Sequence, residues 1–398
     1  MLRTNTQEPR ATPRVAALGG DGIGPEVVAS ARHVLDRAGF AAQWIELPIG
    51  WELWKAEGDA LPARTLEGLR SCDAALLGAI TSKPEREAAA ELAPALRDRG
   101  LVYRSAVVRL RQELDLYACL RPARTWPGLG ELGLGGRVNI LTVRENTEGL
   151  YIGLEFASLA ESPLSAWHAE RYGPDDGRVA ASVRVTSERA SLRIARRAFD
   201  AARERGARRV TLLEKPNILR QSGGVMVECA RRVAASFPEI ELEVENIDAA
   251  CMHAVMHPSR YGVVLAENLF GDIFSDLAAG LTGGPGLAAS ANVGDFFGVF
   301  EPVHGSAPDL AGSGRANPIA TILAGAMMAR HVGQGQIADR IENAVGAVLA
   351  TGGVRTPDLG GTNGTVEMTE AIVHALESDS AYVSGELKPP KLEEAIDV

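Results

Sequence analysis

The chain has 398 residues, of which 46% are hydrophobic, and its formal net charge is −10. A chain of this length can bury a large core and should form two domains or one large composite domain. The acidic balance argues against nucleic acid and anionic membranes as partners. There is no apolar run of about 18 residues, which predicts no membrane span, and the four widely spaced cysteines (Cys72, Cys119, Cys229 and Cys251) favour a reducing, cytoplasmic location.

The first elements form a strand, a glycine turn and a helix. Met1–Pro13 is polar and is expected to be a disordered leader. A predicted strand at Val15–Leu18 then runs into the turn Gly19–Glu26 and a helix, with Pro25 in its first turn. The last three glycines of this turn are spaced two residues apart, so they do not form the dinucleotide-binding fingerprint.

A true match to that fingerprint occurs at Gly128, Gly130 and Gly133, but it precedes the predicted strand Val138–Val143. Because the motif requires a strand before it and a helix after it, this segment is interpreted as a flexible loop.

Strands and helices alternate along the rest of the chain. Further strands are predicted at 74–77, 180–185, 209–213, 240–244 and 262–266. Helices are predicted at 85–99, 188–205, 225–235, 319–332 and 337–349. This alternation indicates an α/β fold.

A pair of aspartates marks the helix that follows the strand at 262–266. Asp272 and Asp276 are four residues apart, so they lie on one helix face, where two like charges repel. A divalent cation would convert this repulsion into attraction, because carboxylate oxygens are the ligands that Mg²⁺ and Mn²⁺ prefer. The alternative is a solvated helix face with an acidic bias.

Three arginines stand at the ends of apolar elements: Arg111, Arg121 and Arg144. Each could pair with a nearby acid such as Asp115 or Glu145. Together with an acidic metal site, however, they favour a substrate with several carboxylates, which guanidinium groups bind in a bidentate manner.

Candidate proton-transfer residues follow. Lys215 leaves a predicted strand and could act as a base, and Tyr151 could donate a proton or be an ordinary half-buried tyrosine. Asp248 ends the predicted strand 240–244 and is a candidate third metal carboxylate. The loop Glu301–Asp309 contains His304, which could be a simple turn residue or part of a nucleotide-binding loop.

These stretches resemble the isocitrate/isopropylmalate dehydrogenase family of metal-dependent oxidative decarboxylases. The matching segments lie between about residues 15 and 375 and are Gly20–Glu26, Arg111–Pro122, Arg144–Tyr151, Lys215–Asn217, Gly271–Asp276, Glu301–Asp309, Asn317-Pro318 and Arg355–Gly361. The resemblance implies an α/β, two-domain fold whose cofactor site is not of the Rossmann type. The larger domain would comprise residues 1–117 and 284–398, and the smaller one residues 118–283.

The resemblance also implies roles for these residues. Arg111, Arg121 and Arg144, with Ser105, would bind the substrate. Asp272 and Asp276 would hold Mg²⁺ or Mn²⁺ together with Asp248 of a second subunit. Lys215, also from that subunit, would assist deprotonation of the substrate hydroxyl, and Tyr151 would protonate the enol. The protein would therefore be a homodimer or a larger homo-oligomer with shared active sites.

The cofactor implied is NAD. The residues expected to line its site are Thr81, Asn217, Glu301, His304, Gly305, Ser306, Ala307, Asp309, Asn317 and Asp358. Asp309 is the basis for NAD over NADP, because an acidic residue accepts from ribose hydroxyls and repels a 2′-phosphate. NADP-dependent members of the family carry lysine and tyrosine where this chain has Asp309 and Leu310.

The substrate is expected to be a 2-hydroxy-3-carboxy acid with an anionic γ-substituent: isocitrate, homoisocitrate or a close analogue such as a phosphonate. Arg104 and Arg109 would add positive charge near Ser105, although Val107 stands where isocitrate enzymes carry asparagine. The alternatives are tartrate, D-malate or 3-isopropylmalate as the substrate. A non-catalytic regulatory subunit is disfavoured, because the expected catalytic side chains are all present.

Overall fold

The computed structural model describes residues 12–130, 137–159, 162–173 and 179–383. The predicted leader lies outside these residues except for its last two positions, and Gly133 of the glycine-rich loop lies outside them as well.

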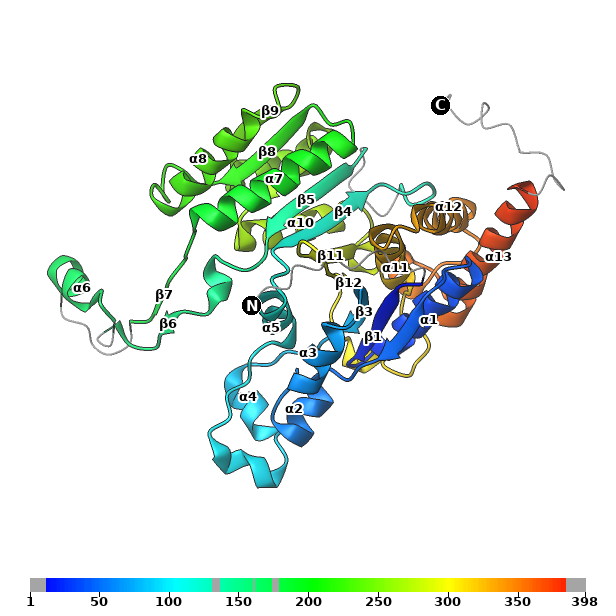
Figure 1. The fold of residues 1–398 in the computed structure, drawn as a ribbon, viewed down its shortest axis with the longest axis horizontal. Coiled ribbons are helices and arrows are strands. Elements are labelled where there is room, and N and C mark those ends of the chain that lie inside the picture. Colours follow the sequence, from blue (N-terminus) through cyan, green and yellow to red (C-terminus); the bar gives the residue numbers. More distant parts are fainter. Residues whose placement is uncertain (1–11, 131–136, 160–161, 174–178, 384–398) are drawn as a thin grey trace.

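A mixed ten-stranded sheet passes through the part of the molecule that is described (Figure 1). In spatial order its strands are β2 (Gln43–Glu46), β1 (Arg14–Gly20), β3 (Ala74–Ala79), β12 (Gly298–Pro302), β11 (Ala289–Val293), β4 (Ala118–Arg124), β5 (Asn139–Glu145), β10 (Val263–Ala266), β8 (Arg209–Glu214) and β9 (Glu241–Asn246). β4 and β11 run antiparallel to both of their neighbours, and the remaining pairs are parallel.

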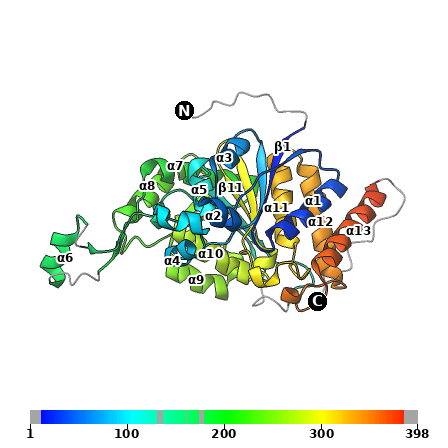
Figure 2. The same ribbon diagram turned by 90° about the horizontal axis from the view of Figure 1, so that it is seen from below.

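Helices cover both faces of the sheet. One face carries α1 (Gly24–Arg37), α7 (Glu188–Glu204), α8 (Ser222–Ala234) and α11 (Ile319–His331), with α12 (Gly335–Thr351) and α13 (Thr365–Val383) packed outside. The other face carries α2 (Trp51–Glu57), α3 (Ala63–Leu69), α4 (Glu85–Ala90) and α5 (Ala106–Glu113) at one end, and α9 (Ile247–Met256) and α10 (Asn268–Gly280) at the other. Figure 2 shows α7 and α8 on the opposite side of the sheet from α9 and α10.

The core follows the alternation of the strands. In β10, Val263 and Leu265 join the hydrophobic cluster under α7, while Val264 and Ala266 join the cluster under α10. Successive side chains of a strand point to opposite faces, so a strand buried on both faces must be apolar throughout. The buried strand predicted at 262–266 is thereby confirmed.

A short arm projects from the main body (Figures 1 and 2). It contains β6 (Glu155–Phe156), α6 (Ser165–Tyr172) and β7 (Ala181–Ser182), and β6 pairs with β7 in a separate sheet. The strand predicted at 180–185 was therefore too long, because only two of its residues pair as a strand. Trp167 and Tyr172 of the arm are 55% and 66% exposed.

Two other predictions need correction. The helix predicted at 85–99 is interrupted: α4 ends at Ala90, and the 3₁₀ helix Pro94–Arg99 follows. Pro94 has no N–H to continue the α-helical hydrogen bonds, which accounts for the break. Strands β2, β6, β11 and β12 were not predicted. The other predicted helices and strands are confirmed to within a few residues.

None of the described helices is long and apolar enough to cross a bilayer. Within the described residues, none of the four cysteines forms a disulfide bond.

Candidate active site

The candidate catalytic residues lie at the carboxyl ends of the parallel strands. Arg144 is near the end of β5, α10 begins directly after β10, and Lys215 follows β8. These three strands are neighbours in the order β5-β10-β8, so their carboxyl ends meet at one edge of the sheet. This edge is where ligands bind in open α/β sheets.

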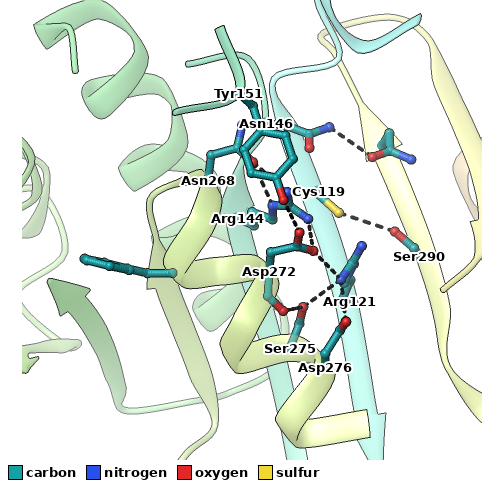
Figure 3. Close-up of polar contacts among 12 residues, drawn as sticks. Cys119, Arg121, Arg144, Asn146, Tyr151, Asn268, Asp272, Ser275, Asp276 and Ser290 are labelled. Atoms are coloured by element: carbon teal, nitrogen blue, oxygen red, sulfur yellow. Dashed lines mark hydrogen bonds and ion pairs between the residues drawn. The ribbon is translucent and has the colours of Figure 1, made fainter. Parts of the chain in front are cut away.

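Asp272 is the centre of the hydrogen-bond network (Figure 3). Its carboxylate accepts hydrogen bonds from Nη1 of Arg121, at 3.0 Å, from Nη1 of Arg144 and from the hydroxyl of Tyr151. Burial opposes ionisation of Asp272, but Arg144 and Arg121 outweigh it and lower its pKa. The carboxylate is therefore ionised at neutral pH.

Asn268, one turn before Asp272 on α10, holds Arg144 in place. Its Oδ1 accepts from Nε and Nη2 of Arg144 at 3.0 Å and 2.6 Å. The side chain of Arg144 is only 1% exposed, and burial lowers its pKa. A planar guanidinium with fixed partners on two edges has little rotational freedom. Asn268 was not identified as a site residue from the sequence, although it begins the helix that carries Asp272.

Asp272 and Asp276 lie on one face of α10, as their four-residue spacing predicted, and both accept hydrogen bonds from the guanidinium of Arg121. Nη1 of Arg121 lies 3.0 Å from Oδ1 of Asp272 and 2.9 Å from Oδ1 of Asp276, and Oγ of Ser275 accepts from the same nitrogen at 2.9 Å. Both carboxylates therefore reach a single positive centre. Oxygen donors in this arrangement fit a hard divalent cation.

Tyr151 lies in the 3₁₀ helix Leu150–Ile152, with its ring 5.0 Å from the guanidinium of Arg144. Burial and the hydrogen bond to Asp272 raise its pKa. The phenol is therefore protonated at neutral pH, and it is directed into the network rather than into an apolar core.

Arg111 connects the network to strands β11 and β12. Its Nη2 donates to Oε1 of Glu301 at 3.2 Å, and the same oxygen accepts from Nδ2 of Asn292 at 2.7 Å. Arg111 is close enough to influence the pKa values of Arg144, Tyr151 and Asp272. The three arginines thus converge on one region, and their partners are distant acids rather than Asp115 or Glu145.

The positive charge expected near Ser105 is smaller than the sequence suggested. Ser105 is half-buried at the start of α5. Arg109 forms an ion pair with Asp59 and donates to the carbonyl of Leu61 at 3.2 Å, so it has a structural role. Arg104 remains exposed.

Lys215 and Asp248 pair with each other and not with Asp272. Asp248 is in the first turn of α9, rather than at the end of a strand, and its side chain is 67% exposed. The ion pair with Lys215 lowers the pKa of Asp248. Among the described residues, no three acidic, histidine or cysteine side chains gather as a metal cluster. One chain thus brings together two of the three predicted metal ligands.

Glu214, the residue before Lys215, has a structural role. Its fully buried carboxylate accepts from Nη2 of Arg184 at 2.7 Å and from the backbone N–H of Lys215 at 2.9 Å. Glu214 thus holds the backbone at Lys215, where the turn after β8 begins, and the side chain of Arg184, which follows β7 of the arm.

A separate cavity of about 430 Å³ lies beside the loop Glu301–Asp309. The predicted cofactor residues on its wall are His304, Gly305, Ala307, Asn317 and Asp358. Nε2 of His304 is buried and has no hydrogen-bond partner within the described residues, while burial lowers the pKa of the ring. Asn317 donates to Asp358 at 2.9 Å. An apolar cavity with an unpaired donor or acceptor and a carboxylate fits a nucleoside.

Two loops close tightly at the edge of this cavity. Oγ1 of Thr81 lies 2.7 Å from Oγ of Ser306, and the N–H of Ile23 donates to the carbonyl of Ser306 at 2.9 Å. Gly22 has a φ of +57°, and a Cβ there would lie 2.0 Å from the carbonyl oxygen of Ser306. The glycine-rich turn therefore serves close packing against the candidate cofactor loop.

Other predicted cofactor residues lie elsewhere. Asp309 is exposed next to the wall residue Leu310, Glu301 is buried against Arg111, and Asn217 is exposed in the turn after β8. Arg315 lines the cavity and was not identified from the sequence, because an isolated arginine in a glycine-rich loop has no distinguishing pattern.

The fold and the site define a class of protein: an α/β enzyme with a cluster of arginines and carboxylates at the carboxyl ends of its strands and a separate cavity of about 430 Å³. The family model described as isocitrate/isopropylmalate dehydrogenase matches residues 14–372. The chain belongs to this family and is a decarboxylating dehydrogenase.

Two relatives and one solved structure support this family assignment. The chain is 42% identical over 365 residues to an isocitrate/homoisocitrate dehydrogenase of Thermus thermophilus, covering 92% of this chain and 99% of that one. It is 40% identical to a 3-isopropylmalate dehydrogenase of Archaeoglobus fulgidus, with the same coverage. It is also similar to the crystal structure of isocitrate dehydrogenase from Methylococcus capsulatus, with a TM-score of 0.80, 40% identity, and coverage of 92% of this chain and 99% of that chain.

Proposed function

We propose that the protein catalyses the metal-dependent, NAD-linked oxidative decarboxylation of a 2-hydroxy-3-carboxy acid with an anionic γ-substituent. The observation that carries this proposal is the balance of charges around Asp272. Three arginines (Arg111, Arg121 and Arg144) face three carboxylates (Asp272, Asp276 and Glu301). A divalent cation would leave two excess positive charges, which a substrate with at least two carboxylates neutralises.

The catalytic residues would act by positioning and proton transfer. Asp272 and Asp276 would hold Mg²⁺ or Mn²⁺, and the arginines would exchange their present acidic partners for substrate carboxylates. When bound, the cation supplies an electron sink for loss of CO₂, and the nicotinamide accepts the hydride. Tyr151, protonated at neutral pH, would return a proton to the enol carbon.

A second copy of the chain would complete the site. The exposed apolar side chains of Met252, Val255 and Met256 on α9 and of Ile273 on α10 support self-association through these two helices. They are also the helices that carry Asp248 and Asp272. Association across them would bring Asp248 and Lys215 of one chain toward Asp272 of the other, where Lys215 would take the hydroxyl proton.

NAD is the proposed cofactor, seated along His304–Asp309 with Asn317 and Asp358. The exposed carboxylate of Asp309, next to the wall residue Leu310, supports NAD over NADP because it would repel a 2′-phosphate. Arg315 on the wall could pair with a phosphate of the cofactor. Rates with NAD and NADP under equal conditions test the assignment, and preference for NADP would contradict it.

Isocitrate, homoisocitrate or a phosphonate analogue is the proposed substrate, and 3-isopropylmalate is the second candidate. The Archaeoglobus relative, named for 3-isopropylmalate, is almost as similar as the Thermus relative. In addition, Arg109 is paired with Asp59, which reduces the positive charge available for a γ-anion.

The deciding experiment is NADH formation by the purified protein with Mg²⁺ and NAD. The substrates to compare are isocitrate, homoisocitrate, 3-isopropylmalate, D-malate, tartrate and a phosphonomethyl analogue. We expect the highest kcat/KM with a γ-anionic acid. No NADH with any of these acids would contradict the proposal and favour a non-catalytic subunit.

A further inference from the structure

A second and larger cavity, of about 600 Å³, lies on the opposite face of the sheet from Asp272. Its floor is formed by β4, β5, β11 and β12, one wall by α7, and the other by α11 and α12. In β4, Arg121 points to the candidate active site, while its neighbours Leu120 and Pro122 line the cavity. The two sites therefore share strands but not side chains.

The floor of the cavity is apolar. Leu141 and Phe300 from the strands and Leu323 from α11 are among its lining residues, and each is less than 10% exposed. A cavity of several hundred Å³ with such a floor has the size and surface of a site for a small organic ligand.

Charged groups surround this floor with an excess of positive charge. Four arginines (Arg124, Arg197, Arg205 and Arg330) and two glutamates (Glu204 and Glu342) line the cavity. This excess is notable in a chain whose net charge is −10. Burial lowers the pKa of Arg124, and Arg330 lowers it further although Glu342 opposes both.

Most of these arginines already have partners. Arg124 lies 3.8 Å over the ring of Trp126 and pairs with Glu342 at 3.2 Å, and Arg330 pairs with Glu342 at 2.8 Å. Arg205 donates to Oδ1 of Asn139 at 2.6 Å. These contacts hold the arginines of both walls at the edge of the cavity.

Arg197 is different, because within the described part of the chain it makes no hydrogen bond or ion pair. Its Nε is buried without a partner. The preceding residue on α7, Arg196, instead pairs with Asp200 at 3.2 Å and is 56% exposed. The buried Nε of Arg197 therefore lacks an acceptor, and an anionic ligand in the cavity would supply one.

We propose that this cavity binds an amphipathic organic anion, with a flat apolar body on the strand floor and one carboxylate, sulfonate or phosphate on Arg197. Because its walls come from α7 on one side and α11 and α12 on the other, such a ligand would bridge segments that the predicted two-domain division assigns to different domains. The site is separate from the Asp272 network and does not depend on the proposed reaction.

The probe for this site is 8-anilinonaphthalene-1-sulfonate, an aromatic sulfonate whose fluorescence rises in apolar surroundings. Titration of the wild-type protein should give a saturable site. Arg197→Leu should weaken binding about tenfold or more, the worth of one charge-assisted hydrogen bond, and Arg197→Lys should restore part of it. Arg196→Leu is the matched control and should leave the affinity unchanged.

A second variant, which blocks the cavity sterically, tests the proposal even if Arg197→Leu does not fold. Met327→Trp fills the cavity from α11 without changing its charge and should also abolish saturable binding. Cooperative thermal unfolding of each variant establishes that it is folded. Absence of a saturable site in the wild type, unchanged affinity in folded Arg197→Leu or Met327→Trp, or equal loss in Arg196→Leu would overturn the proposal.

Discussion

Asp272 receives hydrogen bonds from side chains that are far from it in the sequence. Arg144 precedes it by 128 residues, Arg121 by 151 and Tyr151 by 121. One carboxylate therefore sets the positions of two candidate substrate-binding groups and of the candidate proton donor. Removing its charge should affect both cation binding and stability.

Asp272→Asn is expected to weaken Mg²⁺ binding at least about 100-fold and to lower the free energy of unfolding at pH 7. The second effect follows because Arg144, whose side chain is 1% exposed, loses its ionic partner. The expected loss in the free energy of unfolding is about 1–3 kcal/mol, because Asp272 is partly exposed and the asparagine oxygen can still accept a hydrogen bond from Arg144. Isothermal titration with Mg²⁺ and urea unfolding in EDTA measure the two effects.

The pH dependence of this stability difference has a definite sign. The pKa of Asp272 is lowered from 3.8, so its stabilising contribution is complete above about pH 4 and is lost as pH falls through the lowered pKa. The difference between wild type and Asp272→Asn should therefore be constant from about pH 7 to pH 5. A difference that already shrinks in this range would contradict the assigned partners.

Tyr151→Phe removes only the hydroxyl that donates to Asp272. We expect kcat to fall about 10²–10⁴-fold, the usual contribution of a general acid, with KM changed much less. Steady-state kinetics measure both values. Tyr117→Phe is the control, because the Tyr117 hydroxyl donates to Asp295 at 3.2 Å, outside the network, and kcat should not change.

At the level of elements, the site depends on the close contact between α10 and β5. Gly271 lies on the face of α10 that meets β5, where a Cβ would approach Cβ and Cγ of Arg144 at 2.7 Å. The absence of a side chain lets the helix that carries the acids approach the strand that carries the arginine. The sequence alone places Gly271 inside a predicted helix, where glycine is normally unfavourable, and gives no reason for it.

Gly271→Ala should therefore displace Arg144 and destabilise the protein by about 1–3 kcal/mol, as overpacking does. We also expect KM for the substrate to rise. Gly280→Ala on the same helix is the control, because a Cβ there meets no atom within 4 Å. It should stabilise the protein by about 0.5–1 kcal/mol. Equal effects of the two substitutions would show that the contact with Arg144 is not decisive.

At the level of the whole molecule, the described chain contains Lys215 and Asp248 as one pair and Asp272 and Asp276 as another. The proposed reaction requires both pairs in a single site. A dimer satisfies this requirement if each chain supplies one pair to its partner.

Subunit complementation tests this arrangement. Lys215→Met and Asp272→Asn should each be inactive, but after dissociation and random re-pairing, about one quarter of wild-type activity should return, because each mixed dimer has one intact site. The rate of NADH formation measures the recovery. Lys215→Met mixed with Asp248→Asn is the control and should recover nothing, since both residues come from the same chain. No recovery in the first mixture would exclude a shared site.

The sequence by itself determined the α/β class and the shared helix face of the two candidate metal ligands. Alternation of short apolar strands with helices has local periods, and Asp272 and Asp276 share a helix face because of their four-residue spacing. Spacing of this kind depends on a few neighbouring residues, so it can be recognised without the fold. The glycine turn before α1 was recognised for the same reason.

Only the tertiary structure decided which charges are available. It paired Arg109 with Asp59, separated Lys215 and Asp248 from Asp272, and placed Arg197 beside a cavity on the far face of the sheet. Such pairings depend on the spatial order of the strands in the sheet and on the face of the sheet to which each side chain points. They join residues separated by tens to more than a hundred positions, and a one-dimensional pattern contains no measure of that distance.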